Sequence, residues 1–125
     1  MVTMDVISED LEEMKKQFPS FKIVNESGTG LGHQANVFLY EKKYDGFEAK
    51  FYAVVLPACF LGSDVYKNNE FQYSIFTHTG EWKENLNMLE KILKKISKKG
   101  IDAVKPQLDG SKLEIYHEKI ESVLL

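Results

Sequence analysis

Arginine is absent from this chain, and all sixteen residues counted as Lys or Arg are lysines. Arginine is the side chain that most often contacts phosphate and guanine in a bidentate manner. The formal net charge is −3 at pH 7, so the chain lacks the basic excess typical of nucleic-acid-binding domains. The lysine-rich run at residues 94–99 has no interleaved aromatic residues. The sequence therefore argues against a nucleic-acid partner.

Cysteine and long apolar runs are almost as scarce. The single cysteine, Cys59, excludes a disulfide within the chain and is typical of a reducing compartment. No stretch approaches the roughly 20 apolar residues that a membrane-spanning helix needs. The first sixteen residues, MVTMDVISEDLEEMKK, are acidic and lack the apolar run of a signal peptide. We therefore expect a cytoplasmic protein that has no membrane partner.

Cofactor motifs are also missing. The segment GTGLG, with Gly28, Gly30 and Gly32, superficially suggests a phosphate-binding loop. A dinucleotide fingerprint needs G-x-G-x-x-G between a strand and a helix, whereas here the spacing differs and a strand-like run follows. We therefore interpret the glycines as a flexible connection between strands, and we expect no cofactor.

The composition that remains is that of one folded domain. The chain has 125 residues, of which 43% are apolar, and it contains eight Phe, six Tyr and one Trp. This length matches a typical single domain and allows a hydrophobic core without disulfides or metals. We therefore expect residues 1–125 to form one globular domain.

The clearest structural signal is a β-hairpin. Asp45-Gly46 separates the strand-like runs ANVFLYEKKY and FEAKFYAVVL, and Asp-Gly favours a two-residue type I′ turn. Such a turn fixes a register in which one face carries two pairs of opposite charge, Lys43 with Glu48 and Glu41 with Lys50. Farther along, the same register pairs Leu39 with Tyr52 and Val37 with Val54. The predicted core face pairs Tyr44 with Phe47, Tyr40 with Phe51, and Phe38 with Ala53.

Helical periodicity predicts two helices outside the hairpin. The first begins at Ser8 as N-cap, places Ile7, Leu11, Met14 and Phe18 on one face, and ends before Pro19. The second covers residues 81–99, with Thr79 as N-cap and Gly100 after its end. Its apolar stripe is expected to pack on the sheet; the stripe consists of Trp82, Leu86, Leu89, Ile92, Leu93 and Ile96.

Two further strands and an ambiguous C-terminus complete the chain. Residues 21–26 and 70–77 read as strands, and residues 60–69 read as a loop. We favour a strand at residues 102–107 followed by a C-terminal helix, for which Ser111 and Glu114 would form a capping box. The alternative is a second hairpin that turns at Asp109-Gly110.

Together these elements predict an α+β fold. We expect a mostly antiparallel sheet of 4–5 strands, with the N-terminal helix and the long amphipathic helix (81–99) packed on one face.

Cys59 and His33 are the candidate catalytic residues. The predicted hairpin register places His33 opposite Ala58, beside Cys59, and an imidazole near a thiol can activate it as a nucleophile. The alternative is a buried, unreactive thiol, because Cys59 lies in the apolar run PACFL and Pro57 interrupts pairing there. The three histidines, His33, His78 and His117, lack metal-ligand spacing, so we expect no metal site.

Three functional classes are compatible with these features. The first is a non-catalytic protein-binding domain, such as an immunity protein, chaperone or adaptor, that binds another protein or itself. The second is a protein that binds a small apolar ligand with the aromatic face of its sheet. The third is a cysteine-dependent enzyme using Cys59 with His33. We prefer the first, because the chain is small and mildly acidic and no catalytic motif is evident.

Overall fold

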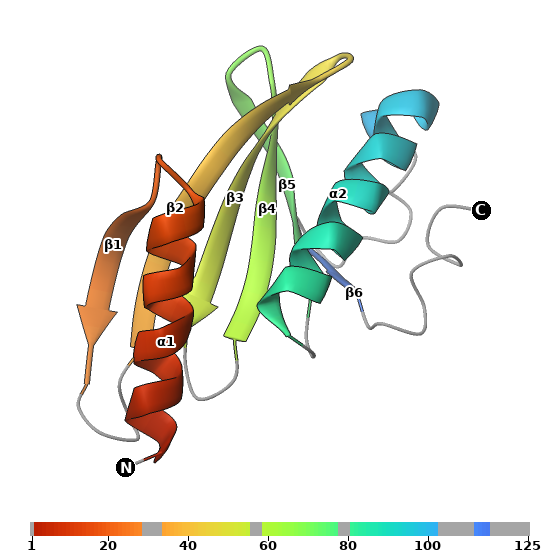
Figure 1. The fold of residues 1–125 in the computed structure, drawn as a ribbon. Helices are drawn as coiled ribbons and strands as arrows, with labels where there is room; N and C mark the ends of the chain where they lie inside the picture. Colours follow the sequence, from red (N-terminus) through yellow and green to blue (C-terminus); the bar gives the residue numbers. More distant parts are fainter. Residues whose placement is uncertain (1, 29–33, 56–58, 78–80, 103–111, 116–125) are drawn as a thin grey trace.

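The structure is a computed structural model that describes residues 2–28, 34–55, 59–77, 81–102 and 112–115. The fold is α+β, as predicted, with helices on one side of a mostly antiparallel sheet (Figure 1). The described elements are α1 (Val2–Gln17), β1 (Lys22–Ser27), β2 (Gln34–Tyr44), β3 (Phe47–Val55), β4 (Cys59–Lys67), β5 (Glu70–Thr77), α2 (Trp82–Lys99) and β6 (Lys112–Ile115).

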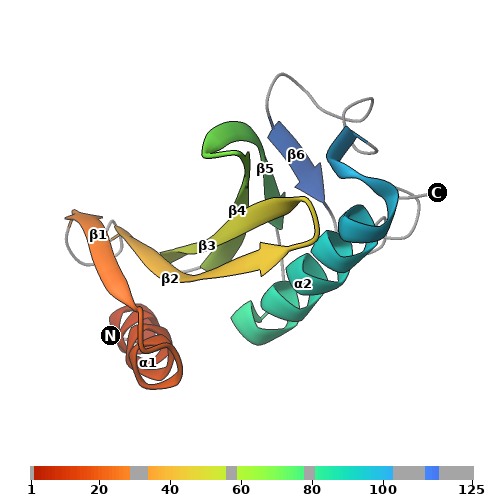
Figure 2. The same cartoon turned by 90° about the horizontal axis from the view of Figure 1, so that it is seen from above.

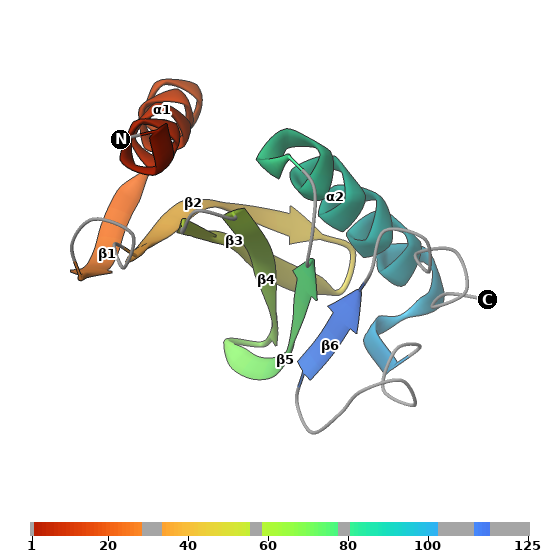
Figure 3. The same cartoon turned by 90° about the horizontal axis from the view of Figure 1, so that it is seen from below.

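The strands form one six-stranded sheet in the order β1-β2-β3-β4-β5-β6. The first five strands are joined as an antiparallel meander, and β6 pairs parallel to β5. The sheet is strongly bent, and α1 and α2 lie on the same side of it when the molecule is viewed from above or below (Figures 2 and 3). The side of the sheet opposite these two helices is called the outer face below.

The β2–β3 hairpin turns at Asp45-Gly46, as predicted. Gly46 has a φ of +89°, which glycine adopts without strain, but Asp45 is not among the residues with positive φ. A type I′ turn requires positive φ at both central residues, so the predicted turn type is wrong although its position is right. Both predicted charge pairs, Lys43 with Glu48 and Glu41 with Lys50, are confirmed as cross-strand neighbours. The near half of the hairpin is therefore paired as the sequence indicated.

A β-bulge at Leu39 changes the far half of this hairpin. Tyr40 pairs with Phe51 but Phe38 pairs with Tyr52, so Leu39 is an extra residue and the predicted pairing of Leu39 with Tyr52 is wrong. Beyond the bulge the register is shifted by one residue, which overturns two further predicted pairs, Val37 with Val54 and Phe38 with Ala53.

The bulge decides which side chains enter the core. Leu39 and Val37 are buried beneath the helices, with exposed fractions of 0% and 1%. Phe38 lies on the outer face, where its ring packs edge-on against Tyr52 at a centroid distance of 5.6 Å. Without the bulge, strict alternation would expose Val37 and Leu39 and bury Phe38. One inserted residue thus lets both halves of β2 present an apolar side to the helices.

Strand β4 occupies residues that we predicted to be a loop. Cys59–Lys67 pairs with β3 along its length and then turns into β5 at Asn68 and Asn69. Both asparagines have positive φ, 53° and 64°, which matches a two-residue hairpin turn. The polar residues near Gly62 obscured this strand in the sequence. Strand β5 has the predicted bounds.

The helix boundaries are partly as predicted. Helix α1 ends at Gln17 as expected but begins at Val2, so Ser8 lies inside the helix and is not its N-cap. Helix α2 begins at Trp82 with Glu81 in the N-cap position; Thr79, the predicted cap, lies outside the described residues. Gly100 ends α2 as predicted, with a φ of +96° and an N–H that donates to the Ile96 carbonyl at 2.7 Å.

The core lies between the two helices and the sheet. The predicted apolar stripe of α2 is buried in full: Trp82, Leu86, Leu89, Ile92, Leu93 and Ile96. Met14 of helix α1 and Phe18, which directly follows the helix, belong to the core. The Phe18 ring stacks on Tyr40 at 5.3 Å and meets the edge of Trp82 at 5.9 Å, so it connects α1 to both the sheet and α2.

The C-terminal prediction is wrong where the structure describes it. Lys112–Ile115 forms strand β6, which pairs with β5, so Glu114 lies in a strand and not in the first turn of a helix. Asp102 lies in a short 3₁₀ turn after α2, not at the start of a strand. Residues 103–111, including Asp109-Gly110, lie outside the described residues.

Among the helices described, none is long and apolar enough to cross a membrane.

Candidate binding surface

The outer face of the sheet carries side chains in rows that cross the strands. Side chains that pair across neighbouring strands project from the same face. One row is mostly aromatic and one is polar. The aromatic row runs through Phe38, Tyr52, Gly62 and Phe76, and the polar row through Glu41, Lys50, Asp64 and Ser74.

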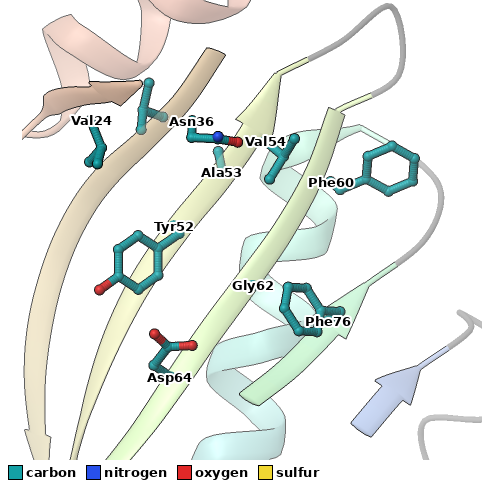
Figure 4. A pocket seen from close by; sticks show the side chains of 10 residues that line it. Val24, Asn36, Tyr52, Ala53, Val54, Phe60, Gly62, Asp64 and Phe76 are labelled. Atoms are coloured by element: carbon teal, nitrogen blue, oxygen red, sulfur yellow. The ribbon is translucent and has the colours of Figure 1, made fainter. Parts of the chain in front are cut away.

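A hollow of about 240 Å³ lies on this face (Figure 4). It forms where the aromatic row reaches Gly62, which contributes no side chain. The ring of Phe76 lies over this glycine, since a Cβ at Gly62 would be 3.1 Å from two of its ring carbons. The residues that line the hollow are Val24, Asn36, Val37, Tyr52, Ala53, Val54, Phe60, Gly62, Asp64 and Phe76.

The lining comes from five neighbouring strands and is mainly apolar. Val24 of β1 closes one side and is 61% exposed, so the hollow is open to solvent there. Phe60 and Phe76 close the opposite side, as Figure 4 shows. An open apolar concavity of this kind favours binding of an apolar group, because its water is released on contact.

Asp64 supplies the negative charge at the lower end of the hollow, where Figure 4 shows its carboxylate near the Tyr52 ring. Its Oδ1 accepts a 2.6 Å hydrogen bond from the Ser74 hydroxyl, and Ser74 is only 9% exposed. Burial, with a smaller contribution from Asp64, raises the pKa of Tyr52 above its ordinary value. The Tyr52 hydroxyl therefore stays protonated and neutral at physiological pH.

The helix-facing aromatic residues do not line this hollow. Phe47 and Phe51 are buried in the core, and Phe51 is fully covered. From the sequence we took the face that carries Phe47 and Phe51 as the aromatic face of the sheet, and the hollow on the outer face was not predicted. Two features could have indicated strand β4 and its outer side. Phe60, Gly62 and Asp64 alternate with residues that are buried, and Asn68-Asn69 forms a turn after them.

Only one member of the predicted catalytic pair, Cys59, lies within the described residues. Cys59 begins β4, and its backbone pairs with Val55 of β3. His33 lies outside the described residues, as do His78 and His117, so the predicted approach of Cys59 to His33 stays a prediction. Gly30 and Gly32 of the glycine-rich segment lie outside them too. Among the residues described, no three potential metal ligands cluster.

Comparisons with protein-family models, with curated proteins and with solved structures find no match to this chain.

Proposed function

We propose that this protein is a non-catalytic protein-binding domain, an adaptor, chaperone or immunity protein in kind, whose binding surface is the outer face of the sheet. The observation that carries the proposal is the open apolar hollow centred on Gly62. An apolar side chain of the partner would enter the hollow as the anchor of the interface. A few residues in well-packed, desolvated pockets supply most of the binding energy in protein interfaces.

The size of the hollow supports a side-chain anchor. Pockets that enclose small-molecule ligands commonly measure about 300–1,000 Å³ and cover most of the ligand. This hollow has about 240 Å³ and is open on the Val24 side. That space suits one large apolar side chain, whose remaining surface would be covered by the rest of the partner.

A second candidate is a small apolar ligand held in the same hollow. The mainly apolar lining with one carboxylate favours it, because ligand sites commonly combine apolar walls with a few polar groups. In that case a small aromatic compound such as indole would bind without any peptide.

Selection of peptides provides the test. The full chain is used to select from a random twelve-residue peptide display library, and the selected peptides are then titrated in solution against two variants. Val24→Asp places a charge on the rim of the hollow. Ile23→Asp is the matched control, since Ile23 is the adjacent residue of β1, is 43% exposed, and does not line the hollow.

We expect Val24→Asp to weaken peptide binding by at least about tenfold and Ile23→Asp to leave it nearly unchanged, because burial of a charge opposes apolar contact. Equal binding by the two variants, or a library that yields no binding peptide, contradicts the proposal. Indole that binds at the hollow more tightly than every selected peptide favours the small-ligand candidate instead.

A further inference from the structure

We propose that the partner carries a lysine or arginine next to its apolar anchor, and that Asp64 recognises this cation. The inference rests on the proposed function, because it names the chemistry of the partner at the same hollow. It is carried by the position of an oriented carboxylate in a mainly apolar lining, whose other polar side chains among the described residues are Asn36 and Tyr52.

Asp64 is held in place from within the sheet. Ser74 on β5 donates to Oδ1 at 2.6 Å, and the nearly complete burial of Ser74 leaves little room for that hydroxyl to move. A carboxylate that is already oriented loses little conformational freedom when it accepts a cation. It also keeps a second oxygen available as an acceptor, since a carboxylate offers about four acceptor positions.

The nearest lysine in the row points elsewhere. Lys50 is the cross-strand neighbour of Asp64, but its Nζ lies 4.7 Å from the centre of the Tyr66 ring, in a cation–π contact. Tyr66 pairs with Glu48, which is the next pair on the same face toward the β2–β3 turn. It therefore lies on the side of the polar row away from the hollow. Within the described residues, no ammonium group lies within ion-pair distance of Asp64.

The surroundings of Asp64 favour a cation over a neutral or negative group. Tyr52 beside it is neutral, so among the described residues that line the hollow the carboxylate carries the only charge. Glu41 and Lys50 of the polar row are cross-strand partners of opposite charge on β2 and β3. When a partner covers the hollow and removes water, the attraction between carboxylate and cation strengthens, because the local dielectric constant falls.

The test uses the peptides selected against the full chain. We expect lysine or arginine beside an aromatic or large aliphatic residue to be enriched among them. For the tightest such peptide, we expect replacement of its basic residue by methionine to weaken binding to the wild-type chain by about tenfold, which is within the range of charge-assisted hydrogen bonds.

The variants form a double-mutant cycle. Asp64→Asn keeps an acceptor for Ser74 and removes the charge, so we expect it to weaken binding of the basic peptide about tenfold and to leave the methionine peptide unaffected. Glu41→Gln is the matched control: it removes one negative charge from the same row, outside the hollow, and should change the affinity less than about twofold.

Selected peptides that are sensitive to Val24→Asp but lack basic residues, or that bind Asp64→Asn as well as wild type, overturn this inference while the proposed function stands. A library without peptides sensitive to Val24→Asp overturns the proposed function itself. Titration with 2-phenylethylammonium tests whether a small cationic ligand, and not a protein, occupies the hollow. If the free amine binds as tightly as the basic peptide, the hollow recognises a small cation and the protein partner is contradicted.

Discussion

The ring of Phe76 covers Gly62 on the outer face of the sheet, at a distance that leaves no room for an unshifted Cβ. Glycine weakens a strand because it has no side chain to pack, and an aromatic ring from a neighbouring strand can compensate by covering its backbone. Gly62 is buried as a result. The same pairing leaves the space beside the ring open, and that space is the hollow.

Substitution of Gly62 tests this relationship. In Gly62→Ala the new Cβ would lie 3.1 Å from the Phe76 ring, which must shift by a few tenths of an ångström to make room. Because alanine also lowers the entropy of the unfolded chain, we expect the free energy of unfolding to change by less than about 1 kcal/mol. Urea denaturation measures it. A loss of several kcal/mol would mean that Phe76 cannot move.

The attachment of α1 depends on Phe18. Its ring contacts Tyr40 of the sheet and Trp82 of α2, and only 9% of the residue is exposed. We expect Phe18→Ala to lower the free energy of unfolding by about 3–5 kcal/mol, as for other buried phenylalanines. Amide hydrogen exchange should also become faster throughout α1.

A change within α1 itself separates this packing from electrostatics. Glu13 of α1 contacts Lys83 of α2 at 3.3 Å, but both side chains are more than half exposed. Glu13→Gln should therefore lower the stability by less than about 1 kcal/mol. If it lowers the stability as much as Phe18→Ala does, the helix is held by charge and not by the aromatic contact.

Asn85 is a polar residue buried in the apolar face of α2. It is fully covered, and neither atom of its amide has a hydrogen-bond partner among the described residues. Burial of an unpaired amide costs about 1–3 kcal/mol in proteins. We therefore expect Asn85→Leu, which is similar in size, to raise the free energy of unfolding by about 1–2 kcal/mol.

Asn85→Ala is the control for this prediction. It removes the same polar atoms but leaves unfilled space, so we expect it to be less stable than Asn85→Leu. Denaturation of the three proteins in urea provides the comparison. Destabilisation by both substitutions would show that the amide has a partner in solution.

Local signals predicted much of the fold. Asp45-Gly46 set the turn and the near half of the hairpin, and the spacing of apolar residues from Trp82 to Ile96 identified the buried side of α2. These features depend on residues close in the chain. They are therefore visible to periodicity and turn chemistry.

The features that escaped prediction depend on neighbours distant in the chain. The bulge at Leu39 is selected because the core beneath the helices takes Val37 and Leu39 in place of Phe38. Strand β4 is stable because β3 and β5 pair with it on both sides, although glycine, serine and aspartate at residues 62–64 favour a loop. The hollow depends on both, so it could not be placed from the sequence.

Alkaline pH should destabilise the fold through Tyr44. Burial of its hydroxyl, followed by the nearby carboxylate of Glu90, raises the pKa of Tyr44 to about 12, against an ordinary value of 10.0. Below pH 10 the tyrosine is protonated in both states and its contribution is fully present. Between pH 10 and 12 the unfolded chain ionises first, so stability falls as the pH rises.

Tyr44→Phe isolates this contribution. The variant keeps the ring that stacks on Phe47 at 5.0 Å and removes the group that ionises, together with a buried hydroxyl that has no partner among the described residues. We expect urea unfolding at pH 8 to show equal or greater stability than wild type. Between pH 10 and 11 the variant should lose stability less steeply, since lysine deprotonation affects both proteins alike. Identical slopes would show that the Tyr44 hydroxyl is as free to ionise in the folded chain as in the unfolded one.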